Sequence, residues 1–429
     1  MFIATKFVVA GASLALFGGF LLAGVLTQPN EEPLPAAVSS PPSLTTAELL
    51  EDFVIEEVEP GIVKVVDDGT GRGLLQLDDI ADIAIGPEGA VWLHARTGTL
   101  FRLGGAGEHN NPGSQVGCSD YLAFSPDGTL HTFEGSTVVK VDPETPEPGQ
   151  ATGSGSDGLH AIGPDRSDPR FHGTSIAIGP DGDIWASWIR DSEMNPGASS
   201  VMRFDGEAWT EHGTPDGLAG VRALGNGAFV CDIAARERDI VWCGVCGAGG
   251  AGFGDGALVR FDGTTWTEVD PFAAIDRPDL RVSDVQSLAL GPGGTLWAMT
   301  ITNTASSIHG EGNPSAQWLD DPLRGPVLVH FDGERWTAYP IDEVVADADP
   351  LYLFAASMVV DAMGTLWLGA DHSNLQTGAS ALVSFDGTTA TRYPSIAGAR
   401  ALAVGPGGGV WVANRDGLYV ITPEAVADE

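Results

Sequence analysis

The stretch IAIGPDGDIW, residues Ile176–Trp185, sets the fold class because it holds two short strands and the turn between them. Apolar residues alternate before the Gly-Pro-Asp-Gly turn, and the second strand contains a tryptophan. Such alternation around an Asp-Gly turn is the sequence signal of a β-hairpin. Six related stretches occur elsewhere in the chain: IAIGPEGAVW (Ile83–Trp92), LAFSPDGTLH (Leu122–His131), CDIAARERDIVW (Cys231–Trp242), LALGPGGTLW (Leu288–Trp297), MVVDAMGTLW (Met358–Trp367) and LAVGPGGGVW (Leu402–Trp411).

A second hairpin follows several of these copies. Its instances are VMRFDGEAWTEH from Val201, LVRFDGTTWTEV from Leu258, LVHFDGERWTAY from Leu328 and LVSFDGTTATRY from Leu382. Two hairpins make a four-stranded unit, and repeated four-stranded units are typical of propeller blades. The sequence therefore predicts an all-β fold, a seven-bladed β-propeller, with the repeated tryptophans packed between blades and the Asp-Gly pairs serving as turns.

The two ends of the chain are predicted to meet in the last blade. The final repeat offers a third strand within Asp416–Val426 and no fourth. The unassigned strand Gly61–Val66 near the start can complete it, with helix or coil over Thr45–Glu57.

The N-terminal segment predicts export. Phe7–Thr27 is an uncharged, mostly apolar run long enough to cross a bilayer as a helix. Lys6 precedes the run, which places the N-terminus in the cytoplasm. We expect a signal-anchor helix at 1–28, a linker rich in Pro, Ser and Ala at 29–58, and a propeller at 59–426. The protein would then be a single-pass membrane protein that contacts the membrane only through this helix, or a secreted one if the segment is a cleaved signal peptide.

Charge excludes one class of partner. The chain has 58 acidic and 21 basic residues, for a net charge of −37. Nucleic-acid binding depends on clustered Lys and Arg, so nucleic acid is not an expected partner. A cationic or neutral ligand fits this charge.

The repeat pattern I-x-x-GPDG-x-LW resembles extracellular propellers of the two-component-regulator type and the streptogramin (virginiamycin B) lyase propeller, over roughly residues 60–425. The lyase resemblance implies a divalent metal, Mg²⁺ or Ca²⁺, held by His and carboxylate groups at the channel mouth. Glu134 falls at the matching place, after His131 in the position where other repeats have Trp, whereas Asp371 and His372 lie one or more positions too late. His94 and His172 are additional candidates.

Loop length predicts the working face. The connections of the GPDG and FDG type are short and share one face, so the long connections share the other. Long connections are predicted at Trp188–Ser200, Val245–Ala257, Thr300–Pro326 and Ala370–Ser380 within blades, and at Asp142–Thr174, His212–Phe229, Asp270–Gln286 and Tyr339–Ala356 between blades. Binding residues concentrate on such loops. The sequence thus predicts a recognition module for a protein, peptide or glycan, with a metal-dependent lyase or lactonase as the alternative.

Cysteines Cys231, Cys243 and Cys246 lie within one predicted hairpin. In an exported protein, a disulfide is the expected use of such residues. Cys231 can pair with either Cys243 or Cys246.

Overall fold

The protein is described by a computed structural model that covers residues 46–50, 53–67, 80–86, 89–95, 99–102, 108–110, 122–134, 136–141, 159–163, 171–190, 200–213, 229–237, 240–246, 256–304, 321–345, 355–370, 381–396, 398–405, 407–414 and 416–422. The chain divides into two units, Met1–Pro41 and Pro42–Glu429, and all the described residues belong to the second. The predicted membrane helix at Phe7–Thr27 lies outside them. None of the helices in the described ranges has the length and apolar character that a membrane span requires.

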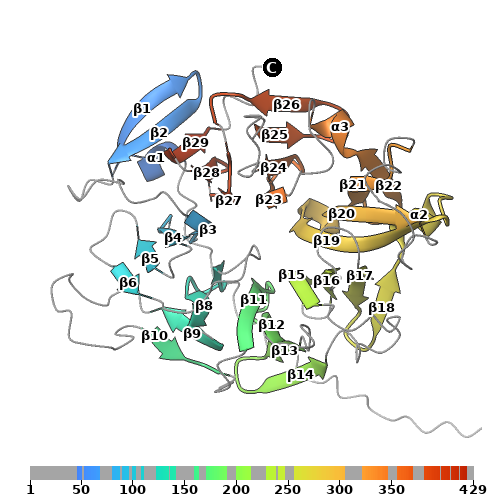
Figure 1. Ribbon diagram of the computed structural model, residues 1–429. Coiled ribbons are helices and arrows are strands. Elements are labelled where there is room, and N and C mark those ends of the chain that lie inside the picture. Colours follow the sequence, from blue (N-terminus) through green and yellow to red (C-terminus); the bar gives the residue numbers. More distant parts are fainter. Residues whose placement is uncertain are drawn as a thin grey trace, which may run out of the picture. The chain divides into compact units, whose positions relative to one another are not determined.

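The described strands form six four-stranded antiparallel sheets and one five-stranded sheet (Figure 1). We number the four-stranded sheets in chain order and call the five-stranded one the closing sheet. Sheet 1 contains β3 (Ile80–Ile85), β4 (Val91–Ala95), β5 (Thr99–Arg102) and β6 (Glu108–Asn110); sheet 2 contains β7 (Ala123–Phe124), β8 (Leu130–Glu134), β9 (Thr137–Val141) and β10 (Leu159–Ala161). Sheet 3 contains β11 (Phe171–Ile178), β12 (Ile184–Arg190), β13 (Ser200–Phe204) and β14 (Trp209–Gly213); sheet 4 contains β15 (Phe229–Glu237), β16 (Ile240–Cys246), β17 (Ala257–Phe261) and β18 (Trp266–Val269). Sheet 5 contains β19 (Leu280–Leu290), β20 (Leu296–Thr304), β21 (Gly325–Phe331) and β22 (Trp336–Pro340); sheet 6 contains β23 (Ala355–Val360), β24 (Leu366–Ala370), β25 (Ala381–Phe385) and β26 (Ala390–Tyr393).

The closing sheet joins both ends of the described chain. Its strand order is β1 (Val54–Glu59), β2 (Ile62–Asp67), β29 (Gly417–Ile421), β28 (Val410–Asn414) and β27 (Ala401–Val404). The predicted pairing of Gly61–Val66 with the last repeat is confirmed, because β2 pairs with β29 and the N–H of Thr422 donates to the carbonyl of Gly61 over 2.9 Å. In Figure 1 the blue β1 and β2 lie beside the red β29.

The first strands of successive sheets contact one another along the chain. These contacts run β3–β7–β11–β15–β19–β23–β27, and β27 contacts β3 in turn. Six predicted repeats form four-stranded sheets, and the seventh supplies β27, β28 and β29 to the closing sheet. The prediction of an all-β propeller is therefore confirmed.

The predicted helix or coil at Thr45–Glu57 is only partly correct. A short helix, α1 (Thr46–Leu50), is present, but Val54–Glu57 belongs to strand β1. A tight turn at Pro60 and Gly61 allows β1 to fold back on β2, and Gly61 has a φ of 74° that favours glycine. Strand pairing gives the backbone of β1 hydrogen-bond partners that a coil would leave to water.

The repeated tryptophans pack between sheets, as predicted. Six equivalent tryptophans are buried: Trp92, Trp185, Trp242, Trp297, Trp367 and Trp411. Trp297 illustrates their setting, because it packs in one cluster with Leu366 and Phe385 of the next sheet. A single sheet cannot bury both of its faces, so these side chains stabilise each sheet against its neighbour.

The repeated Asp-Gly pairs are turns, also as predicted. At the turns of the Phe-Asp-Gly type, the aspartate carboxylate accepts backbone N–H groups from the residues two and three positions later, with Asp262 bonding Thr264 and Thr265 over 2.9 and 2.8 Å. Asp205, Asp332 and Asp386 make the same contacts. These bonds lower the pKa of each of these carboxyl groups.

Candidate recognition face

Short turns lie on one face of sheets 3 to 6. Gly179–Asp183 joins β11 to β12, and Asp262–Thr265 joins β17 to β18. In an antiparallel sheet, first-to-second and third-to-fourth connections lie at one end, while second-to-third and between-sheet connections lie at the other. The opposite face, called here the long-loop face, therefore receives the segments that follow β12, β16, β20 and β24 and those that enter the next sheet. Residues 191–199, 247–255, 305–320 and 371–380 of these segments lie outside the described residues.

Several segments predicted as long loops hold regular structure. Asp270–Gln286 contains the helix α2 (Pro271–Ala274) and the first part of β19, and Tyr339–Ala356 contains α3 (Ile341–Val344). Thr300–Thr304 extends β20. Leu159–Ala161 is the fourth strand of sheet 2, so residues 142–158 join its third and fourth strands and belong to the face of the tight turns, not to the long-loop face. The prediction of loop was wrong at these positions. Asp270 explains α2, because its carboxylate accepts the N–H groups of Phe272 and Ala273 at the helix start.

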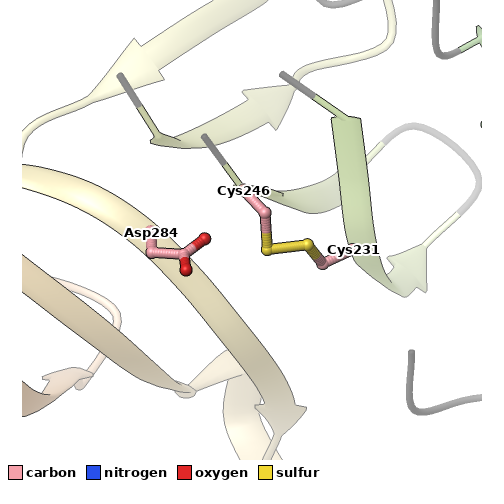
Figure 2. A group of neighbouring side chains, drawn as sticks. All are labelled: Cys231, Cys246 and Asp284. Carbon is pink, nitrogen blue, oxygen red and sulfur yellow. A yellow bond between two sulfur atoms is a disulfide. The ribbon is translucent and has the colours of Figure 1, made fainter. Parts of the chain in front are cut away.

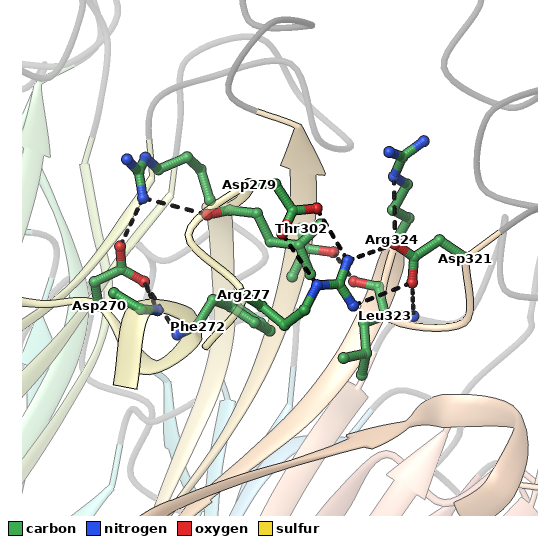
Figure 3. A network of polar contacts seen from close by, with 11 residues as sticks. Asp270, Phe272, Arg277, Asp279, Thr302, Asp321, Leu323 and Arg324 are labelled. Carbon is green, nitrogen blue, oxygen red and sulfur yellow. Dashed lines mark hydrogen bonds and ion pairs between the residues drawn. The ribbon is translucent and has the colours of Figure 1, made fainter. Parts of the chain in front are cut away.

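An ion-pair network covers sheet 5 on this face (Figure 3). Arg277 donates to Asp279 over 3.0 Å and to Asp321 over 2.5 Å, and Asp321 also lies 3.7 Å from Arg324. Burial raises the pKa of Asp321, but the hydrogen bonds from Arg277 and Leu323 outweigh it and hold that pKa below its ordinary value. The network fastens the connection between sheets 4 and 5 to the segment that leads into β21.

A disulfide joins Cys231 on β15 to Cys246 at the end of β16, with a Cα–Cα distance of 5.9 Å (Figure 2). The structure thus selects Cys246 over Cys243 as the partner. Cys243 is a buried free cysteine, and burial, with a further contribution from Asp232, raises the pKa of its thiol. It is therefore unreactive at neutral pH.

The same disulfide lies beside a carboxylate of the next sheet. The sulfur atoms of Cys231 and Cys246 and a carboxylate oxygen of Asp284 on β19 lie within 4.8 Å of one another, and Figure 2 shows the three side chains together. Metal binding by cysteine requires thiolates. Because both sulfurs are bonded to each other, this cluster is not a metal site in the oxidised protein.

The five candidate residues from sequence have different outcomes. Asp371 and His372 lie outside the described residues. Glu134 ends β8 and His172 is the second residue of β11, so only their backbone positions are described. His94 on β4 is buried, which lowers its pKa to about 4 and keeps the imidazole neutral at pH 7.

Two of these residues lie at one boundary between sheets. Phe133 packs so closely on Gly173 that a Cβ at Gly173 would stand 2.4 Å from its ring. Glu134 follows Phe133 and His172 precedes Gly173. The two backbone positions therefore flank the same contact between sheets 2 and 3.

A set of hydrogen bonds between adjacent sheets was not predicted from the sequence. A polar side chain on the first strand of one sheet accepts a backbone N–H at the first strand of the next, in the pairs Asp82–Leu122, Ser175–Ile233, Asp232–Leu288 and Ser357–Leu402, over 2.7 to 3.2 Å. Leu122 directly precedes its strand, β7, and the other three donors lie within theirs. We call these contacts the inter-sheet hydrogen bonds. The signal was present, because each acceptor directly precedes the apolar residues of its repeat.

Comparison with known proteins identifies the fold. No family model matches the chain. No curated protein matches it either. Among solved structures, the extracellular domain of a hybrid two component system protein from B. thetaiotaomicron matches 82% of this chain with 10% identity and a TM-score of 0.52. The GH74 xyloglucanase from Xanthomonas campestris matches 81% with 13% identity and a TM-score of 0.51.

These matches extend over only part of the larger proteins. The chain spans 40% of the first solved structure and 52% of the second. At such identities, the similarity establishes the fold, and it does not transfer the activity of either protein to this chain. The resemblance to extracellular propellers of two-component systems is confirmed at this level: the chain is a β-propeller of the kind found in that extracellular domain.

Proposed function

We propose that this protein is an exported recognition module that binds a protein, peptide or glycan through its long-loop face. One observation carries the proposal: the tight turns lie on one face, and most of the long connections reach the other, with the β9–β10 connection at 142–158 as the exception. Rigid sheets that present long loops on one face are a common arrangement for ligand binding. The α2 helix, the Arg277 network and the Cys231–Cys246 disulfide give this face a fixed base.

The charge of the chain limits the ligand. With a net charge of −37, the propeller repels acidic polymers and favours a cationic or neutral ligand. We therefore expect a basic peptide, a protein with a basic surface or an uncharged glycan.

A peptide library and a glycan array, each screened against the purified propeller, test this proposal. Two variants replace 305–320 or 371–380 by short Gly-Ser segments. The matched controls insert the same segment into the tight turns at Asp262–Thr265 or Asp386–Thr389. Ligands of the native protein should lose binding to the first pair and keep it with the controls. Equal ligand binding by the loop variants and the control variants would show that the binding site is not on the long-loop face.

A metal-assisted lyase or lactonase is the second candidate. The contact between Phe133 and Gly173 supports it, because Glu134 and His172 flank that contact. A carboxylate and an imidazole are suitable ligands for a divalent cation. If they bind Mg²⁺ or Ca²⁺, the cation should stabilise the native protein by about 2.7 kcal/mol at a hundred times its Kd. Glu134→Gln should remove this effect and Asp205→Asn should not. A thermal midpoint unaffected by both cations would reject this candidate.

We also propose the membrane attachment expected from sequence, with an anchor at 1–28, a linker at 29–58 and the propeller at 59–426 outside the cytoplasm. Release after cleavage is the alternative. Cell fractionation combined with N-terminal sequencing separates the two, because cleavage creates a soluble product with a new N-terminus. We further propose that the closing sheet serves as the seventh blade, since β27, β28 and β29 carry the seventh repeat.

A further inference from the structure

Exposed apolar side chains gather on the hairpin of β1 and β2. In the part of the chain that the structure describes, five large hydrophobic side chains are exposed, and four belong to this hairpin. They are Val54 (54% exposed), Ile55 (42%), Val58 (39%) and Val66 (40%). Soluble proteins rarely leave such residues grouped at the surface unless they contact a partner.

The same hairpin provides a backbone edge with which no further described strand pairs. β1 is the outermost strand of the closing sheet, all six of its residues are exposed, and among the described strands only β2 pairs with it. Figure 1 shows β1 on the outer side of β2. An edge strand offers unpaired N–H and C=O groups to an added strand.

The residues before β1 hold this edge in place. The N–H of Gly409 donates to Oγ1 of Thr46 over 3.0 Å, and Phe53 packs edge-on against Trp411 with ring centroids 6.1 Å apart. A Cβ at Gly409 would stand 2.6 Å from Thr46, which indicates close packing of α1 on the sheet. β1 is therefore presented on a fixed support, which lowers the entropy cost of binding.

The charge of the hairpin determines which kind of strand can pair with the edge of β1. The hairpin carries four acidic residues, Glu56, Glu57, Glu59 and Asp67, against one basic residue, Lys64. A second copy of β1 in antiparallel pairing would bring glutamates against glutamates, and like charges on paired strands are destabilising. Because Glu56 and Glu57 are adjacent, one lies on each face of β1. A strand with both apolar residues and Lys or Arg on each of its faces would therefore match the apolar and the acidic side chains.

We propose that the free edge of β1 binds an extended, basic and apolar segment of a partner protein by β-strand addition. This surface is the outer edge of the closing sheet, and it is separate from the long-loop face. Main-chain hydrogen bonds contribute the part of the affinity that does not depend on the partner's sequence. The glutamates select for basic residues in the partner.

The experiment uses a fluorescein-labelled peptide that repeats Val-Val-Lys-Lys, which places valine and lysine on both faces of the strand, as the probe, with the full chain as the protein. Fluorescence anisotropy should show saturable binding. Glu56→Lys combined with Glu57→Lys should weaken it about tenfold, because two cross-strand attractions become repulsions. Glu207→Lys combined with Glu334→Lys changes the charge equally at exposed tight turns and should leave binding within about twofold. A peptide with N-methylated backbone positions should not bind.

Amide hydrogen exchange on the unmodified protein gives a second measurement that needs no variant. The amides of Val54–Glu59 should exchange more slowly when the peptide is bound. Three results would overturn the proposal: equal loss of binding in both double variants, equal binding of the N-methylated peptide, or unchanged exchange of β1. Sedimentation that reveals dimers lost on removal of β1 would assign the edge to a second copy instead.

Discussion

Asp232 on β15 accepts a 2.7 Å hydrogen bond from the backbone N–H of Leu288 on β19, so a buried carboxylate of sheet 4 holds the first strand of sheet 5. The same carboxylate accepts the hydroxyl of Ser175 on β11 over 3.2 Å. It also accepts the N–H of Ile233. Asp232 therefore links three consecutive sheets at their first strands.

Asp232→Ala should destabilise the fold strongly. It leaves buried N–H groups without an acceptor, at a cost of about 3 kcal/mol in the free energy of unfolding. Asp205→Ala, at an exposed turn, is the control and should cost much less. Urea denaturation measures both. Similar losses in the two variants would show that the inter-sheet hydrogen bonds do not stabilise the propeller.

Reduction of the Cys231–Cys246 disulfide should lower stability. The bridge closes a loop with a sequence separation of 15, for which chain entropy predicts about 3 kcal/mol. The unfolding midpoint in urea should fall on addition of a reductant in the native protein. The double variant Cys231→Ala, Cys246→Ala should start lower and no longer respond. Cys243 should resist alkylation in the native state, and rapid labelling there would contradict its burial.

Stability should decrease in mild acid because of buried histidines. Burial lowers the pKa of His94 from 6.5 to about 4, so the unfolded state binds more protons between these values. The contribution of His94 to the free energy of unfolding is therefore fully present above pH 6.5. It is lost as the pH falls toward 4, which lowers the free energy of unfolding by about 3 kcal/mol. His131, His212 and His330 shift in the same direction, also by burial.

His94→Gln isolates the contribution of that histidine. The variant should flatten the dependence of the urea midpoint on pH between 4 and 6.5. His330→Gln is a useful comparison, because that imidazole stacks on Trp297 with ring centroids 3.9 Å apart and is only partly buried. A pH profile that is the same in the native protein and in His94→Gln would refute the assignment.

Closure of the propeller should depend on β2. Deletion of residues 1–67 removes β1 and β2 and leaves β29 at the edge of its sheet, exposing Ile421 and Leu418, which are now buried. We expect loss of cooperative thermal unfolding or strong aggregation, because large buried apolar side chains contribute about 1.5–3 kcal/mol each. Deletion of 1–45 retains α1, β1 and β2 and should leave the thermal midpoint nearly unchanged. If both deletions behave alike, β2 is not needed for closure.

Much of the fold follows from the sequence, because its signals are local. The turns at Asp205 and Asp262 depend on residues two and three positions away, and alternation over a few residues defines each strand. The tryptophans recur at one position of the repeat, so their burial between sheets also follows from the pattern. The pairing of Gly61–Val66 with the last repeat could be inferred because that repeat lacked a strand.

Only the tertiary structure decided the remaining features, because they depend on contacts between residues that are far apart in the sequence. Asp232 and Leu288 are 56 positions apart and meet only when sheets 4 and 5 pack. Cys231 lies where the register between β15 and β16 shifts, between the pairs Val230–Val245 and Asp232–Gly244, and this shift directs it to Cys246 rather than Cys243. β1 carries no repeat motif, and pairing with β2 alone makes it a strand. Local hydrogen bonds and periodicity thus determine the repeats, whereas the contacts between sheets determine the disulfide, the inter-sheet hydrogen bonds and the exposed edge.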